Sequence, residues 1–80
     1  MKFGEWVYKE LAEIKKSVNW LAGRCGKSHS AFLDYKKTDR EPPATVVFLA
    51  VRIIAEEKGC AAESLLLKVG RECYDIGGVS

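Results

Sequence analysis

The sequence is poor in the residues that build metal centres and catalytic sites. Its 80 residues include one histidine, His29, and three cysteines, none of them in a C-x-x-C pair. A structural zinc site needs four ligands of these types, and an odd number of widely spaced cysteines argues against a disulfide framework. There is no glycine-rich phosphate loop either. We therefore expect no metal, no cofactor, no small-molecule substrate and no enzymatic activity.

Long hydrophobic runs are also missing. No apolar run reaches the roughly 18 residues that a membrane span needs, although 48% of the residues are hydrophobic and 30% are charged. The first residues, MKFGEWVYKE, carry charges where a signal peptide has its apolar stretch. Length and composition therefore predict a single domain that stays in the cytoplasm and has no membrane partner.

Basic residues are scarce in the second half of the chain. Residues 1–40 hold nine Lys/Arg and five Asp/Glu, a balance of +4, whereas residues 41–80 hold four and six, a balance of −2. The net charge of +2 is well below that of an obvious nucleic-acid binder. The asymmetry nevertheless indicates that contacts with an anionic partner lie in the first half.

Apolar residues recur every three or four positions along most of the chain, which is the period of a helix. The pattern predicts a compact all-α, five-helix domain over residues 1–74 and a flexible tail over 75–80. The β-branched residues between Val46 and Ile54 are compatible with a strand, but the prolines before them and Gly59 after them favour a helix. The expected helices cover about residues 3–16, 18–25, 29–36, 43–58 and 61–74.

The second and third of these helices are too short to be stable alone, since isolated helices below about 12–15 residues are marginal in water. Ser17 and Ser28 are each placed to cap the start of one of them. Gly26 stands where a left-handed residue would end the second helix. Two short helices with a tight turn between them predict a helix-turn-helix over about residues 17–36.

Individual residues of this segment fit a known pattern. They match a buried Leu-Ala pair, a turn glycine, the cap and apolar anchors of a recognition helix, and a proline before the next helix. These residues are Leu21, Ala22, Gly26, Ser28, Phe32, Tyr35 and Pro42. The stretch from Ser17 to Lys58 therefore resembles the lambda-repressor-like, or Cro/XRE-type, family of DNA-binding proteins. Val18 and Lys27 depart from the family pattern, which has a glutamine and a small apolar residue at these places.

The resemblance implies that the third helix enters the major groove of double-stranded DNA and reads base edges with its outward residues. The candidates for base reading are His29, Ser30, Leu33 and Asp34. Asp34 can only accept hydrogen bonds, so its natural partner is cytosine N4, unless it pairs with Lys27 or Lys37 on the surface.

Cations cluster around the same short helix. They could form an ordinary solvated charge run, but their clustering favours contacts with phosphates, which position a protein without specifying sequence. The candidates for phosphate contact are Ser17, Lys27, Ser28, Lys36, Lys37 and Arg40.

The fifth helix has more leucine than one core face can use. Three consecutive leucines point in three directions around a helix, so some of them would be exposed on a monomer. Exposed apolar patches commonly mark interfaces, and helix-turn-helix proteins usually bind as two-fold dimers. We expect a homodimer through Leu65, Leu66, Leu67, Val69 and Tyr74.

Together with the resemblance, these features predict a sequence-specific transcriptional regulator. The expected protein is a small phage- or plasmid-type repressor, or a Cro-like protein, that binds a palindromic operator as a homodimer. It would be nucleoid-associated in a bacterial or phage-infected cell. The alternative is a protein–protein interaction module of antitoxin or adaptor type, which keeps the fold without reading DNA. Val18 and Lys27 allow this alternative, and the salt dependence of duplex binding separates the two.

Overall fold

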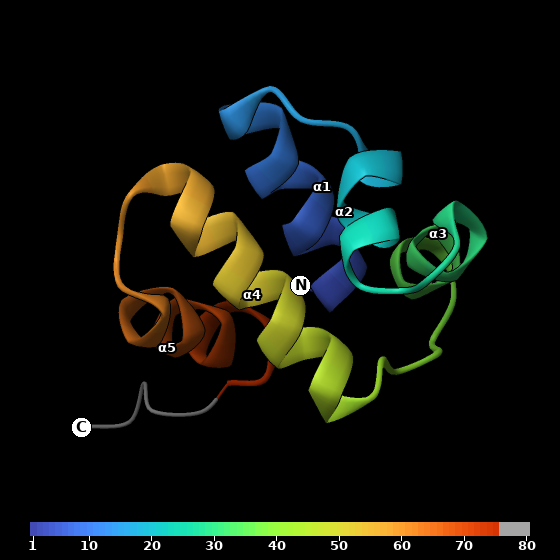
Figure 1. Cartoon of the computed structure of the whole chain (residues 1–80). Coiled ribbons are helices and arrows are strands. Elements are labelled where there is room, and N and C mark those ends of the chain that lie inside the picture. Colours follow the sequence, from blue (N-terminus) through green and yellow to red (C-terminus); the bar gives the residue numbers. More distant parts are fainter. Residues whose placement is uncertain (76–80) are drawn as a thin grey trace.

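The computed structural model describes residues 1–75 and contains five helices and no strand in that range (Figure 1). The helices are α1 (Phe3–Ile14), α2 (Val18–Arg24), α3 (His29–Lys37), α4 (Ala44–Lys58) and α5 (Ala62–Cys73). The all-α prediction is confirmed, including a helix at the β-branched segment 46–54. The predicted flexible tail falls, apart from Asp75, outside the described residues.

Serine hydroxyls start the two short helices. The backbone N–H of Trp20 donates to Oγ of Ser17 at 3.1 Å, and that of Ala31 donates to Oγ of Ser28 at 3.3 Å. Each bond satisfies one of the N–H groups that a helix start leaves without a partner. Both caps therefore lie where the sequence predicts them. α4 begins instead after Pro43, whose backbone is extended.

Left-handed residues end α1, α2 and α4. Gly26 follows α2 with φ +68°, and Gly59 follows α4 with φ +73°. Glycine adopts this conformation without steric cost, and both helix ends lie where the sequence predicts them. α1 ends in the same way at Lys15, with φ 58°, and the N–H of Lys16 donates to the carbonyl of Leu11 at 3.1 Å. α1 therefore stops before the end predicted for it.

α1 lies at the centre of the fold and packs against α3, α4 and α5. Trp6 is completely buried, and its ring stacks on that of Phe3 with the centroids 5.7 Å apart. Phe32 of α3 is also completely buried and meets Tyr35 edge-on at 5.5 Å. Large aromatic rings therefore anchor both α1 and α3 in the same core.

α1 and α3 approach so closely at Gly4 that there is no room for a side chain. A Cβ atom at this position would lie 2.6 Å from Cα of Lys36 and would overlap the backbone between Tyr35 and Lys36. Contact of backbone with backbone leaves neither helix free to shift. Gly4 therefore sets the position of α3, which carries all the predicted base-reading residues.

A buried carboxylate connects α1 to α4 and α5. Glu10 is completely buried, and its oxygens contact the ammonium of Lys58 and, at 3.5 Å, that of Lys68. Lys58 also reaches Glu13 at 3.0 Å. The hydrogen bond with Glu10 raises the pKa of Lys58, and the hydrogen bond with Lys58 lowers the pKa of Glu13. Because a buried charge is tolerated only when it is paired, this network holds the three helices in register.

The half-buried thiol of Cys73 makes the stability of the domain sensitive to alkaline pH. Burial raises the pKa of Cys73 from 9.0 to about 11, because desolvation disfavours the thiolate. Between these values the unfolded chain has lost the proton and the folded chain keeps it. The free energy of unfolding should therefore fall as the pH rises through this range. Lys58 adds to the loss at still higher pH, since its pKa is raised above 10.5.

Urea unfolding at about pH 8 and about pH 10.5 measures this effect. The unfolding midpoint of the wild type should be lower at the higher pH, and Cys73→Ala should reduce the difference. Cys60→Ala is the control, since Cys60 is exposed. An unchanged pH dependence in the Cys73 variant would contradict the assignment.

Candidate nucleic-acid interface

α2 and α3 are joined by residues 25–28 and pack directly on each other. Leu21 and Phe32 are completely buried, and Ala22 is 2% exposed. A residue as small as alanine lets neighbouring helices come close. The N–H of Lys27 donates to the carbonyl of Ala22 at 2.9 Å and closes the end of α2. The two helices therefore form one fixed unit with α3 on its outside.

The predicted base-reading residues share one face of α3. His29 and Ser30 are exposed in its first turn, and Leu33 and Asp34 follow one turn later and are half-buried. The buried Phe32 anchors the helix from the side of the core. Figure 1 shows α3 at one edge of the molecule and α5 at the other. The structure therefore brings these four residues together on one surface.

Asp34 is held by an arginine from the loop after α3. Its Oδ2 lies 3.4 Å from Nη1 of Arg40. Thr38 turns the loop back, because its hydroxyl donates to the carbonyl of Asp34 at 2.7 Å and accepts from the N–H of Arg40 at 3.1 Å. The partner of Asp34 is therefore Arg40, and not Lys27 or Lys37 as the sequence suggests. A phosphate contact by Arg40 would therefore compete with this ion pair.

The other predicted phosphate contacts differ in how accessible they are. Lys27 and Lys37 are exposed and form no ion pair within residues 1–75. Lys36 is half-buried, and its Nζ lies over the ring of Tyr8 in α1, 4.3 Å from the ring centroid. The hydroxyls of Ser17 and Ser28 are exposed but already accept the capping bonds. Lys27 and Lys37 are therefore the most available cations beside α3.

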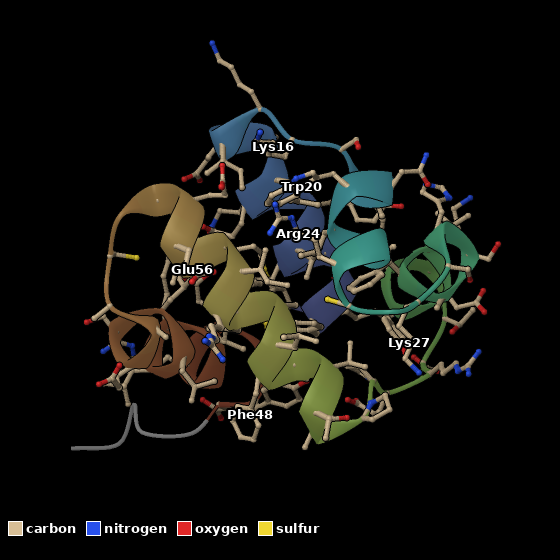
Figure 2. All side chains as sticks on the ribbon, in the orientation of Figure 1. Lys16, Trp20, Arg24, Lys27, Phe48 and Glu56 are labelled. Carbon is tan, nitrogen blue, oxygen red and sulfur yellow. The ribbon has the colours of Figure 1, made fainter. Side chains whose placement is uncertain are left out.

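Two cations lie over an aromatic ring of α2, a cluster that was not predicted from the sequence. The ring of Trp20 is half-buried, with Nζ of Lys16 5.2 Å and Cζ of Arg24 4.9 Å from its centroid (Figure 2). Trp20 and Arg24 are four residues apart within α2, so they lie on one side of that helix, whereas Lys16 reaches the ring from the loop before α2. The spacing of Trp20 and Arg24 is a signal that could have found this pair, and none marks Lys16. The ring holds two further cations on the basic half of the molecule, of which Lys16 also lies 3.9 Å from Glu57 of α4.

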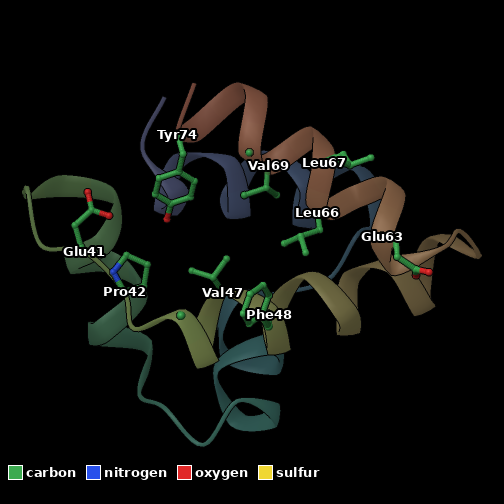
Figure 3. Close-up of a pocket in the computed structure, with 11 residues that line it drawn as sticks. Glu41, Pro42, Val47, Phe48, Glu63, Leu66, Leu67, Val69 and Tyr74 are labelled. Carbon is green, nitrogen blue, oxygen red and sulfur yellow. The ribbon is translucent and has the colours of Figure 1, made fainter. Parts of the chain in front are cut away.

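A large apolar groove lies between α4 and α5 (Figure 3). Its volume is about 810 Å³. Phe48 and Leu67 on its walls are 57% and 64% exposed, and Glu41 and Glu63 stand at its two ends. The other side chains that line it include Pro42, Val47, Leu66, Val69 and Tyr74.

The structure divides the residues predicted for the dimer interface. Leu65 and Val69 are 5% and 1% exposed, because they lie on the face of α5 that is turned to the core. They are therefore packing residues of the single chain, and the surface part of the prediction reduces to Leu66, Leu67 and Tyr74. Phe48 of α4, which was not predicted to belong to the interface, adds a large exposed ring to the same surface.

Comparison with known proteins gives no relative of the chain. No protein-family model, no curated protein and no solved structure matches it. Within residues 1–75, no helix has the length and apolar character to cross a membrane. The same residues contain no group of three His, Cys, Asp or Glu side chains that could hold a metal ion.

Proposed function

We propose that the protein is a sequence-specific regulator that binds double-stranded DNA and reads the major groove with α3. In this proposal α2 and α3 act as a helix-turn-helix. α2 crosses the phosphate backbone, and the first turns of α3 contact base edges. The observation that carries the proposal is the outer face of α3. The four candidate base-reading residues lie together in the first two turns of α3. The buried side chain of Phe32 and the close contact with Gly4 fix the opposite side of this helix.

The charges around this face support the proposal. Lys27 precedes α3 and Lys37 ends it, and both are exposed. Lys16 and Arg24 lie over Trp20 beside the start and end of α2. Such cations neutralise phosphates and release counterions, which supplies affinity that does not depend on sequence. Discrimination between sequences then comes from the face of α3.

A regulator of this kind acts as a homodimer on a palindromic operator, with half-sites about one DNA turn apart. The resemblance of residues 17–58 to the lambda-repressor-like family supports a small phage- or plasmid-type repressor or a Cro-like protein. Such a protein works in the cytoplasm, associated with the nucleoid.

An interaction module of antitoxin or adaptor type is the second candidate function. The apolar groove between α4 and α5 favours it, because a groove of this size with exposed walls offers a binding site for another protein. This module would keep the fold but would not select a DNA sequence. Its duplex binding, if any, would be weak and indifferent to sequence.

Substitutions around α3 should separate base reading from phosphate contact. An operator is first selected from random duplexes with the purified protein. His29→Ala, Ser30→Ala or Asp34→Ala should relax the preference at one or two base pairs, by about 1–3 kcal/mol each. Lys27→Ala or Lys37→Ala should weaken binding to the operator and to a scrambled duplex alike. Each should also lower the slope of log affinity against log salt by about one unit.

Lys9→Ala is the matched control for the lysine variants. Lys9 pairs with Glu72 of α5 at 3.5 Å, so its removal takes away the same charge at a place turned toward α5. Its salt slope should stay that of the wild type. Suppose instead that the His29, Ser30 and Asp34 variants all bind both duplexes like the wild type. Then α3 is not the reading element, and the interaction module is the better account.

A further inference from the structure

We propose that the groove between α4 and α5 is filled by α5 of a second copy of the chain. The two α5 helices run antiparallel, with Leu67 at the two-fold axis. This geometry specifies the interface of the homodimer in the proposed function, and it rests on that proposal. Its basis in the structure is the surface of α5 itself, and its test needs no DNA.

One line of side chains along α5 is complementary to itself when it is reversed. Glu63, Leu67 and Arg71 follow each other at intervals of four residues, so they lie along one side of the helix. Leu67, in the middle, is 64% exposed. Glu63 and Arg71 are exposed at the two ends, and neither has an ion pair within residues 1–75. The line therefore has an acid, an apolar centre and a base, all without a partner in this part of the chain.

A two-fold axis through Leu67 gives each of these groups a partner. It places Leu67 against Leu67 of the second copy and Glu63 opposite Arg71 of the second copy. Both ion pairs form together, because a two-fold interface repeats every contact. A parallel arrangement would instead put acid against acid and base against base, which is unfavourable. The charges therefore select the antiparallel register.

The groove provides room for the helix of the second copy. It runs beside α5, and its volume is about 810 Å³ (Figure 3). Gly70 lies on its wall without a side chain, so a partner helix can come close there. Phe48 and Leu66 flank the position and would cover the sides of the incoming helix. α4, α5 and their counterparts would then form a four-helix arrangement with an apolar centre.

A second copy fits this surface better than a small apolar ligand does. Such a ligand would fill the apolar centre, but it would give Glu63 and Arg71 no partner and would leave much of Leu67 in water. Helix α5 of a second copy buries Leu67 and gives both Glu63 and Arg71 an ion-pair partner. The charge pattern therefore identifies the occupant, whereas the groove alone does not.

Charge reversal tests the register in the purified full chain without DNA. At micromolar concentration the wild type should sediment at about twice the chain mass of 8.9 kDa. Glu63→Arg and Arg71→Glu each create two like-charge contacts across the axis. Each should raise the dimer dissociation constant by about tenfold or more. The double variant should recover most of the lost affinity, because both ion pairs re-form with their signs exchanged, although the reversed charges no longer favour the dipole of α5.

The rescue cannot arise inside one chain. Positions 63 and 71 are separated by about 12 Å along the helix, too far for a direct ion pair. Both side chains are exposed, so all three variants should keep the circular dichroism spectrum of the wild type. A double variant as weak as the single variants would overturn the antiparallel register. If the wild type stays monomeric at hundreds of micromolar, a second copy does not fill the groove and the proposal fails.

A cysteine at the axis gives a second, independent measurement. Leu67→Cys in a Cys60→Ser background should form a disulfide-linked dimer under mild oxidation, because the two thiols meet at the axis. If only monomer is found, Leu67 does not lie on the axis and the proposal fails. These outcomes are distinct from failure of DNA reading. The duplex titrations of the α3 variants measure DNA reading separately, and sedimentation without DNA does not depend on it.

Discussion

Replacing Gly4 by alanine is expected to destabilise the domain by about 3 kcal/mol. The new Cβ would overlap the backbone of Tyr35 and Lys36, which cannot rotate away as the end of a side chain can. α1 and α3 must then separate, and the packing around Phe32 is lost. A domain of this size has a total stability of about 4–12 kcal/mol. The loss should therefore lower the melting temperature by about 15 °C.

Gly23→Ala is the matched control for this substitution. Gly23 also lies in a helix, and nothing stands within 4 Å of the Cβ that it would gain. Alanine is the better helix former by about 0.5–1 kcal/mol, so this variant should be slightly more stable than the wild type. Thermal unfolding followed by circular dichroism compares the two. If both glycine variants are equally stable, α1 and α3 do not cross as closely as described.

Removing the ammonium of Lys58 is expected to destabilise the domain by about 3–5 kcal/mol. In Lys58→Met, Glu10 stays buried and keeps only Lys68, at 3.5 Å, as a cationic partner. The buried carboxylate is then poorly compensated. Glu13 loses its partner as well, but it is exposed and adds little. The urea midpoint at neutral pH measures the loss.

The double variant Glu10→Met with Lys58→Met should recover most of this stability. Replacing both members of a buried ion pair by apolar residues is often neutral or stabilising, whereas removing one member is not. The two substitutions should therefore be strongly non-additive. Lys9→Met is the control, since Lys9 and Glu72 form an exposed pair worth less than about 1 kcal/mol. A Lys58 variant as stable as the Lys9 variant would show that Glu10 does not depend on Lys58.

The parts of the fold that could be predicted from the sequence depend on neighbouring residues. A serine caps a helix through an N–H three residues on, as Ser17 and Ser28 do. Glycine ends a helix through its own backbone, as at Gly26 and Gly59. Because cap, period and end are all local, the five helices and the shared face of α3 follow from the order of residues alone.

The parts that escaped prediction depend on what lies opposite in space. Gly4 is an ordinary helical glycine until the backbone of Lys36 is placed beside it. Glu10 stands three residues after Val7 and four before Ile14, so the helical period already puts it on the apolar face, but the cations that pair with it come from α4 and α5. Arg40 is paired with Asp34 because Thr38 turns the loop back. No period or spacing in the sequence shows which backbone of α3 meets Gly4, which cations of α4 and α5 meet Glu10, or how the loop after α3 turns.

The network around Glu10 has a consequence for how the chain is made. Synthesis runs from the N-terminus, so Glu10 leaves the ribosome long before Lys58 and Lys68, the cations that neutralise it. A nascent chain that contains only α1, α2 and α3 cannot bury this carboxylate without a large penalty. The burial of Glu10 therefore waits at least until Lys58 of α4 has been made. In folding as in the finished structure, α1 depends on the second half of the chain for the charges that its buried carboxylate needs.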